Sequence, residues 1–113
     1  MVEERFQEAR RALVAERERL QAELAETVQQ PEQMTYGSQA AAGTQVFEQQ
    51  RDLALRDRAI HQLALVDAAL ARLDEGTWGR CQGCGRQIAP ERLDALPWAA
   101  RCIDCQQTER RRR

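Results

Sequence analysis

The chain is poor in aromatic residues, which make up 4% of its 113 residues, and it contains one histidine and no lysine. With so few aromatic side chains a large globular core is not expected, and a helical hairpin fits the composition better. No apolar stretch is long enough to span a membrane. All 17 basic residues are arginine, which together with the many alanines suggests a GC-rich genome. At this length the chain forms one domain, or one small domain with an appendage.

The charge balance and the N-terminus restrict the location and the partners of the protein. The formal net charge is −1, and a zinc ion bound by four thiolates would add about two negative charges. This balance argues against broad, non-specific binding to nucleic acid, which needs a basic face. Residues 1–5 are charged and helical in character, unlike a signal peptide. We therefore expect a cytoplasmic protein without a membrane partner, and in that compartment cysteines favour metal over disulfides.

Four cysteines, the only ones in the chain, carry the clearest chemical signal. They are spaced C-x2-C-x17-C-x2-C, as Cys81, Cys84, Cys102 and Cys105. Two close pairs of soft thiolates are what a tetrahedral Zn²⁺ site requires, and the long gap lets the chain return to close the tetrahedron. We predict that these cysteines hold one structural zinc ion per chain. Disulfides and a redox-active dithiol are the alternatives, but nothing indicates export and a dithiol needs no second matched pair.

The glycines inside and after the first cysteine pair have a predicted role in the turn. Gly83 and Gly85 are expected to supply the positive φ that such tight knuckles often need.

The residues ahead of the cysteines show the pattern of two long helices. One helical pattern runs over residues 2–30 and ends before Pro31. A second runs from an expected N-cap at Thr44 to Glu75. The segment 31–43 contains proline, glycine, serine and threonine, and is therefore the predicted turn at the tip of a hairpin, in which residues 39–42 can still form some helix.

Apolar stripes along both helices predict how they pack. The expected core positions are Phe6, Ala9, Leu13, Leu20, Leu24 and Val28 in the first helix, and Val46, Leu53, Ile60, Leu63, Val66, Leu70 and Leu73 in the second. Because the intervals are three, four and seven residues, we expect helices of matching length that bury these stripes against each other as an antiparallel coiled coil over residues 1–75.

Residues 76–105 form the predicted metal module. Gly76 is expected to cap the second helix, and a short helix is expected to start at Pro90. A module this small cannot build a self-sufficient core, so zinc would supply folding energy of the order of 10 kcal/mol. Apolar side chains are expected around the site or against the hairpin base: Trp78, Ile88, Leu93 and Leu96. Residues 106–113 are predicted to be a solvated basic tail.

Characteristic segments flank the cysteines. They read ALARL at 69–73, GTWGRCQGCG at 76–85, RLDA at 92–95 followed by Pro97, and CIDCQ at 102–106. The cysteine spacing alone is shared by many zinc modules, but the G-x-[YFW]-G-x-C and R-L-x-A-x-P patterns are more specific. With these segments the chain resembles the DksA/TraR family of bacterial RNA polymerase-binding regulators.

The resemblance implies a zinc-binding transcription regulator that acts on RNA polymerase, with no sequence-specific DNA binding and no enzymatic activity of its own. In this family the hairpin tip enters the secondary channel of the polymerase, through which nucleotides reach the active site. The zinc module rests at the channel entrance. Acidic residues at the tip then influence initiation near the catalytic Mg²⁺.

The sequence departs from the family pattern at two places. Well-known members carry paired aspartates followed by alanine at the tip, whereas residues 38–43 contain no acid and Glu32 is the only carboxylate in 31–43. The basic residues that contact the alarmone ppGpp in responsive members correspond here to Leu96 and Gln106. The resemblance therefore does not predict a response to the alarmone, or the direction of regulation.

Five further residues invite interpretation. His61 is expected at the surface of the second helix rather than at the metal, and Asp104 is expected to support the second knuckle structurally. Trp98 is expected to pack on the zinc module rather than contact a partner. Met34 and Tyr36 either face a partner or hold the turn together, and the sequence does not separate these two roles.

Two other functions stay open. The chain could be a zinc-thiolate protein-interaction or redox-sensing module that does not act on polymerase. It could also bind nucleic acid directly through the arginines at 110–113. An enzyme is not expected, because the sequence shows no nucleophile–base set, no phosphate loop and no open metal position. A hairpin that satisfies its own apolar stripes is expected to be a monomer.

Overall fold

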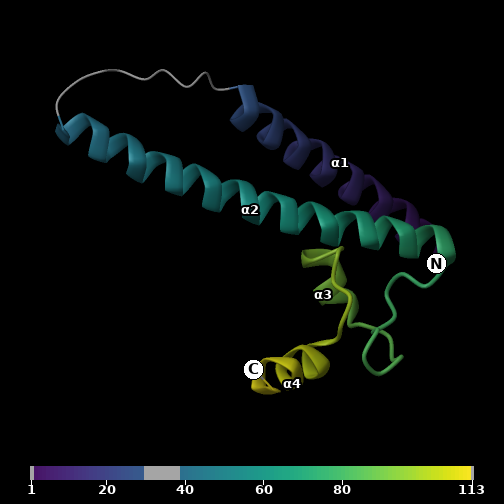
Figure 1. Ribbon diagram of the computed structural model, residues 1–113. Coiled ribbons are helices and arrows are strands. Elements are labelled where there is room, and N and C mark those ends of the chain that lie inside the picture. Colours follow the sequence, from purple (N-terminus) through teal and green to yellow (C-terminus); the bar gives the residue numbers. More distant parts are fainter. Residues whose placement is uncertain (1, 30–38, 113) are drawn as a thin grey trace.

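The computed structural model describes residues 2–29 and 39–112, and within this part of the chain the elements are helices without strands. They are α1 (Val2–Gln29), α2 (Gln39–Glu75), α3 (Pro90–Ala95) and α4 (Ile103–Arg112). Figure 1 shows α1 and α2 as two long helices, with α3 and α4 on one side of α2. The molecule is elongated, with extents of 60 × 33 × 20 Å. The predicted class, a long helical hairpin followed by a small four-cysteine module, is confirmed.

The half of the hairpin next to the module has a continuous apolar core. Its buried residues are Ala9, Leu13 and Leu20 from α1, and Ala59, Val66, Ala69, Leu70 and Leu73 from α2. The side chains of Leu13 and Val66 are fully buried. Each is expected to contribute about 1.5–3 kcal/mol through removal of its apolar surface from water. The predicted stripes therefore form the core in this half.

Two ion pairs between α1 and α2 show in which relative direction the helices run. Arg10 contacts Asp74 at 2.8 Å, and Arg17 contacts Asp67 at 3.9 Å. The arginines advance along α1 while the aspartates step back along α2, so the helices are antiparallel. Because all four side chains are substantially exposed, each pair contributes at most about 1 kcal/mol. The pairs favour this register more than they add stability.

The distal half of α2 does not follow the prediction. Val46, Leu53 and Ile60 were expected in the core, but they are 54%, 60% and 47% exposed. Followed towards the N-terminus of α2 at heptad spacing, the helix face that carries the buried Ala59 has polar residues at 45, 49, 52 and 56, and none of these is buried. The three apolar residues lie close to this face in sequence but roughly 100° around the helix from positions 45, 52 and 59.

The expectation of matching lengths is also wrong, because α2 has 37 residues and α1 has 28. Figure 1 shows the two helices drawing apart towards the Gln39 end of α2. The first residues of α2 lie in the predicted turn segment, where some helix at 39–42 was left open, while the second helix was expected to start at about Thr44. Alanines at 40–42 favour helix strongly enough to offset the cost of Gly43, about 1 kcal/mol. The rest of the predicted turn, 31–38, and Glu32, Met34 and Tyr36 within it, lie outside the described residues.

The end of α2 is closed by the predicted glycine cap. Gly76 has a φ of +79°, and its amide donates to the Leu73 carbonyl at 3.2 Å. The Thr77 amide donates to the Arg72 carbonyl at 2.9 Å. This pair of hydrogen bonds is the Schellman motif, which satisfies carbonyls that the helix leaves unpaired. It turns the chain sharply from the hairpin into the module.

The two short helices of the module differ in how well the sequence predicted them. α3 begins at Pro90, as expected. α4, in contrast, runs through the segment predicted to be a solvated tail. Asp104 lies in its first turn and arginines lie in its last, so both ends complement the helix dipole.

Among the described residues, no helix combines the length and the apolar character that crossing a membrane would require.

Candidate metal centre

The first cysteine pair lies in a tight loop between two antiparallel bridge residues, Arg80 and Gln87. The Cys81 amide donates to the Arg86 carbonyl at 2.8 Å, and the Gly85 amide donates to the Cys81 carbonyl at 2.9 Å. Gly85 has a φ of +78°, as predicted, and this conformation would strain other residues. The loop therefore curls back on itself, and its two sulfur atoms lie within 4.8 Å of each other.

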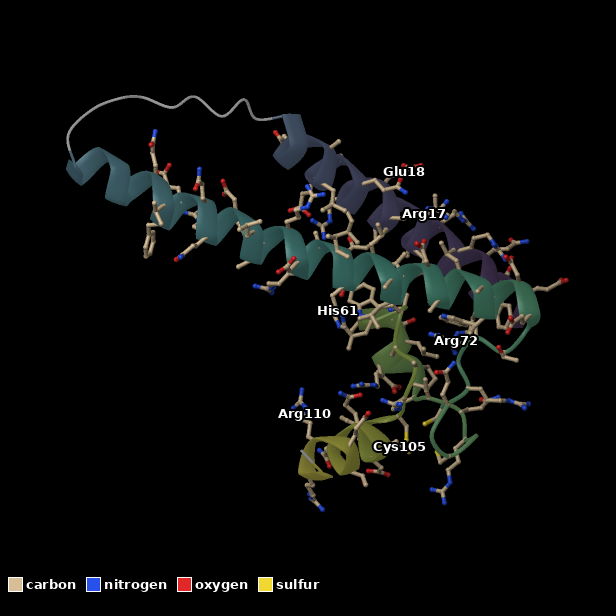
Figure 2. The ribbon with its side chains drawn as sticks, viewed as in Figure 1. Arg17, Glu18, His61, Arg72, Cys105 and Arg110 are labelled. Carbon is tan, nitrogen blue, oxygen red and sulfur yellow. The ribbon has the colours of Figure 1, made fainter. Side chains whose placement is uncertain are left out.

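The second pair lies at the start of α4. Cys102 immediately precedes the helix and Cys105 lies in its first turn. Figure 2 shows Cys105 at this end of α4, on the module side of α2. The four cysteine sulfur atoms all lie within 4.8 Å of one another. The structure thus brings together all four predicted site residues.

The spacing of the sulfurs suits a zinc ion. Zn–S bonds of about 2.3 Å in a tetrahedron place the sulfurs about 3.8 Å apart. The sulfurs of Cys84 and Cys102 are 3.8 Å apart, and the widest separation requires only a small contraction. Four thiolates are also the donor set that zinc prefers. The residues present therefore fit a zinc ion, in agreement with the zinc prediction from the cysteine spacing.

Hydrogen bonds from backbone amides polarise the site. The amides of Gly83 and Cys102 donate to Cys81 Sγ at 3.3 Å and 3.2 Å. Burial alone would raise the pKa of Cys81, but the amides of Cys102, Cys84 and Gly83 and the Cys105 thiol outweigh it, and the pKa falls to about 6. Hydrogen bonds to Cys81 and then to Cys102 raise the pKa of Cys105 to about 12. The cluster can ionise one thiol easily, and a bound cation would favour ionising all four.

Gly83 has a different role from the one predicted. Its φ is not positive, so backbone freedom does not explain it. A Cβ added there would lie 2.9 Å from Cys105 Sγ and 3.2 Å from Cys105 Cβ. Glycine is needed because the two knuckles approach too closely for any side chain.

The apolar residues predicted around the site pack as expected. Trp78, Ile88 and Leu93 are buried, and Leu96 packs against them. The Trp78 ring meets the Phe6 ring of α1 edge to face, with centroids 5.5 Å apart and planes at 80°. This contact joins the module to the base of the hairpin. Trp98 is half-buried and packs against the same core, in line with the expectation that it packs on the zinc module.

The burial of Arg72 was not predicted from the sequence. This residue is only 7% exposed, and burial lowers its pKa against the opposing influence of Glu75. Its Nη2 donates to the Trp98 carbonyl at 3.4 Å, while its Nε has no hydrogen-bond partner. The apolar periodicity of the helix did not indicate this burial, because an arginine beside buried leucines usually points to solvent.

His61 lies at the surface, as expected, whereas Asp104 was expected to support the second knuckle and is exposed. The exposed carboxylate of Asp104 lies in the first turn of α4, and its backbone carbonyl accepts a hydrogen bond from Thr108 Oγ1 at 2.9 Å. His61 lines a groove of about 800 Å³ between α2 and α4, whose other wall includes Arg110 (Figure 2). Leu96 and Gln106, the positions that the resemblance matched to alarmone-contacting residues, line the same groove.

Comparisons with known proteins agree on one family. Residues 76–111 match the sequence profile of the prokaryotic dksA/traR C4-type zinc finger. The chain is 36% identical over 107 residues to the RNA polymerase-binding transcription factor DksA of Haemophilus influenzae, covering 93% of this chain and 74% of that protein. It is 33% identical over 98 residues to the factor of the same name from Escherichia coli K12, covering 85% of this chain and 65% of that protein.

A solved structure extends the similarity to the whole architecture. The transcription factor DksA2 from Pseudomonas aeruginosa superposes with a TM-score of 0.78 at 27% sequence identity. The match covers 95% of this chain and 84% of that one. The similarity therefore includes the hairpin as well as the cysteine module.

Proposed function

Because the chain belongs to the DksA/TraR family of C4-type zinc finger proteins, we propose that it binds RNA polymerase and regulates transcription. The observation that carries this proposal is the similarity of both parts together: the hairpin and the four-cysteine module align with one RNA polymerase-binding factor over 93% of the chain. A resemblance limited to the cysteines would support only a zinc module. The protein is proposed to act as a cytoplasmic monomer without catalytic activity of its own.

The metal centre is proposed to hold one structural zinc ion per chain, with Cys81, Cys84, Cys102 and Cys105 as ligands. Four protein thiolates leave no open coordination position, so the ion would support folding rather than catalysis. The module, residues 76–105, contributes few buried residues of its own, so its fold depends on the metal. A Cys102→Ser variant should lose zinc and the ordered module, and unchanged melting with one zinc per chain would refute the assignment.

The hairpin, residues 1–75, is proposed to enter the secondary channel of the polymerase. With 37 residues, α2 spans roughly 55 Å at 1.5 Å per residue, and the module lies towards its C-terminal end (Figure 1). The opposite end is thus free to probe a deep, narrow channel while the module rests at the entrance. The sequence at 38–43 carries no acid, so this tip would not bring paired carboxylates to the catalytic Mg²⁺.

The experiment that tests this proposal is binding of the zinc-loaded protein to the core RNA polymerase of its host. Fluorescence anisotropy of the labelled protein is measured with and without a competitor known to occupy the secondary channel. Saturable binding that the competitor abolishes is the expected result. No binding at micromolar concentration would refute the function, and binding that the competitor leaves unchanged would refute the channel placement alone.

A second candidate function follows from the exposure of the sulfur atoms. Cys84 is exposed and Cys102 and Cys105 are partly exposed, whereas only Cys81 is buried. Accessible zinc thiolates can be oxidised and release their metal, so the module could serve as a redox-sensing interaction module. Zinc release at low peroxide, with a reversible change in partner binding, would favour this function. Retention of zinc under the same conditions would count against it.

A further inference from the structure

Residues 97–101, which we term the bridging segment, connect α3 to the second pair of cysteines. The segment is held from the hairpin side by two side chains that donate to successive carbonyl groups. Trp78 Nε1 donates to the Pro97 carbonyl at 2.8 Å. Arg72 Nη2 donates to the Trp98 carbonyl at 3.4 Å. The first of these bonds has ideal length and the second is weak.

The same segment is held from the metal side. The Gln82 amide, inside the first knuckle, donates to the Ala100 carbonyl at 2.8 Å. Arg92 Nε of α3 donates to the Arg101 carbonyl at 3.1 Å. The next residue is Cys102, whose amide donates to a sulfur of the first pair. The bridging segment therefore lies between the hairpin and the cluster and presents Cys102 to it.

The two hairpin-side donors are themselves fixed in place. Trp78 is 8% exposed, and its ring is held edge to face against Phe6 of α1. Arg72 is 7% exposed, and its backbone forms part of the cap that ends α2. Because both donors are held in place in the folded module, they restrict the bridging segment that presents Cys102 to the metal.

From these contacts we infer that Trp78 and Arg72 are positioning residues for the metal centre, acting through the bridging segment on Cys102. Without either donor the folded module would lose a hydrogen bond to the segment, and because zinc binding and folding of the module are coupled, the loss would appear as weaker zinc affinity. Linkage is reciprocal, so a bound zinc ion fastens the module to the hairpin by the same factor. This inference rests on the zinc site proposed above.

The principal test is the zinc affinity of a Trp78→Phe variant of the full-length chain, measured by competition with a chromophoric chelator. Phenylalanine keeps a ring against Phe6 but deletes the donor to the Pro97 carbonyl. Zinc affinity should fall by roughly threefold to tenfold, the range expected for one net hydrogen bond. The Co²⁺-substituted variant should keep the absorption bands of a four-thiolate tetrahedral site. Wild-type affinity in Trp78→Phe would overturn the inference.

The control is a hairpin variant that touches neither donor. Leu20→Val weakens the buried core of the hairpin at a position away from the bridging segment, and its zinc affinity should stay within about twofold of wild type, the size of a small mutational effect. A loss in Leu20→Val equal to that in Trp78→Phe would overturn the inference, because general hairpin stability would then explain both. Failure of the wild type to bind zinc would instead remove the zinc site itself.

Arg72→Met separates positioning from ordinary stabilisation. Replacement of a buried charge that lacks a full set of partners by an apolar side chain is often neutral or stabilising. The melting temperature of the zinc-free hairpin should therefore not fall, whereas zinc affinity should fall by about twofold to threefold, as expected for a weak hydrogen bond. A fall in melting temperature with unchanged zinc affinity would assign Arg72 a purely structural role.

Discussion

Replacement of Gly83 by alanine should disrupt the metal centre through a steric clash. The added Cβ would lie 2.9 Å from Cys105 Sγ, whereas ordinary contacts of this kind are about 3.5–4.0 Å. The sulfur would have to retreat by roughly 0.6–1.1 Å to relieve the overlap. Metal–ligand distances tolerate only about 0.2 Å, so the start of α4 must move as well.

The cost of this rearrangement sets the expected effect. Overpacking of a close-packed site typically costs about 1–3 kcal/mol, which corresponds to roughly 5-fold to 150-fold weaker zinc binding. Chelator competition measures this loss directly, and the Co²⁺ spectrum reports distortion of the thiolate tetrahedron. The matched control is Gly85→Asn, because position 85 has a φ of +78° and open space around a Cβ, and asparagine tolerates this conformation.

The zinc affinities of the two variants together distinguish a clash with Cys105 from backbone strain. Gly85→Asn should lose much less zinc affinity than Gly83→Ala, since it adds backbone strain but no sulfur has to move. Wild-type affinity in Gly83→Ala would show that the knuckles do not approach as closely as the structure has them. An equal loss in both variants would point to backbone strain rather than to the clash with Cys105.

Three further predictions concern the hairpin and its dependence on the metal. Removal of zinc by a chelator should abolish the near-ultraviolet circular dichroism of Trp78 and Trp98 in the module while most helicity remains, because the core between α1 and α2 does not include the cysteines; parallel loss of both signals would contradict this. Leu13→Ala should lower the free energy of unfolding in urea by about 2–5 kcal/mol, since a fully buried leucine leaves a cavity; a loss below about 1 kcal/mol would indicate that the core is loose. Arg19→Gln should raise the pKa of Glu16 measured by NMR, because the hydrogen bond from Arg19 is the main cause that lowers this pKa. The stability that the pair contributes is present above the pKa of Glu16 in the unfolded chain and is lost as pH falls through its pKa in the folded protein. An unchanged pKa would show that the pair does not form in solution.

The sequence predicted the near half of the hairpin because its apolar period and its phase agree. Leu13, Leu20, Val66 and Leu70 all lie on the faces that the two helices share. In the distal half the period continued through Val46, Leu53 and Ile60, but the phase had shifted by one residue. The spacing of apolar residues does not indicate which face of a helix its partner covers. The exposure of the three distal residues was therefore not predictable from the apolar stripe of the second helix.

The metal centre was predictable in its ligands and not in its surroundings. The spacing of the cysteines was enough to predict the cluster, whereas the close approach at Gly83 arises between residues distant in sequence. The burial of Arg72 likewise depends on how the module folds back on α2. Helix α4 was missed because a run of arginines reads as solvated, although at a helix C-terminus these charges are favourable.

The distal end of the hairpin is proposed to enter RNA polymerase. A photoreactive residue at position 47 can test this placement, because Phe47 is 72% exposed on the distal half of α2. Crosslinks are expected to polymerase residues that line the secondary channel, and these should be lost when a channel competitor is added. Crosslinks to the outer surface of the polymerase, or crosslinks that the competitor does not affect, would contradict it.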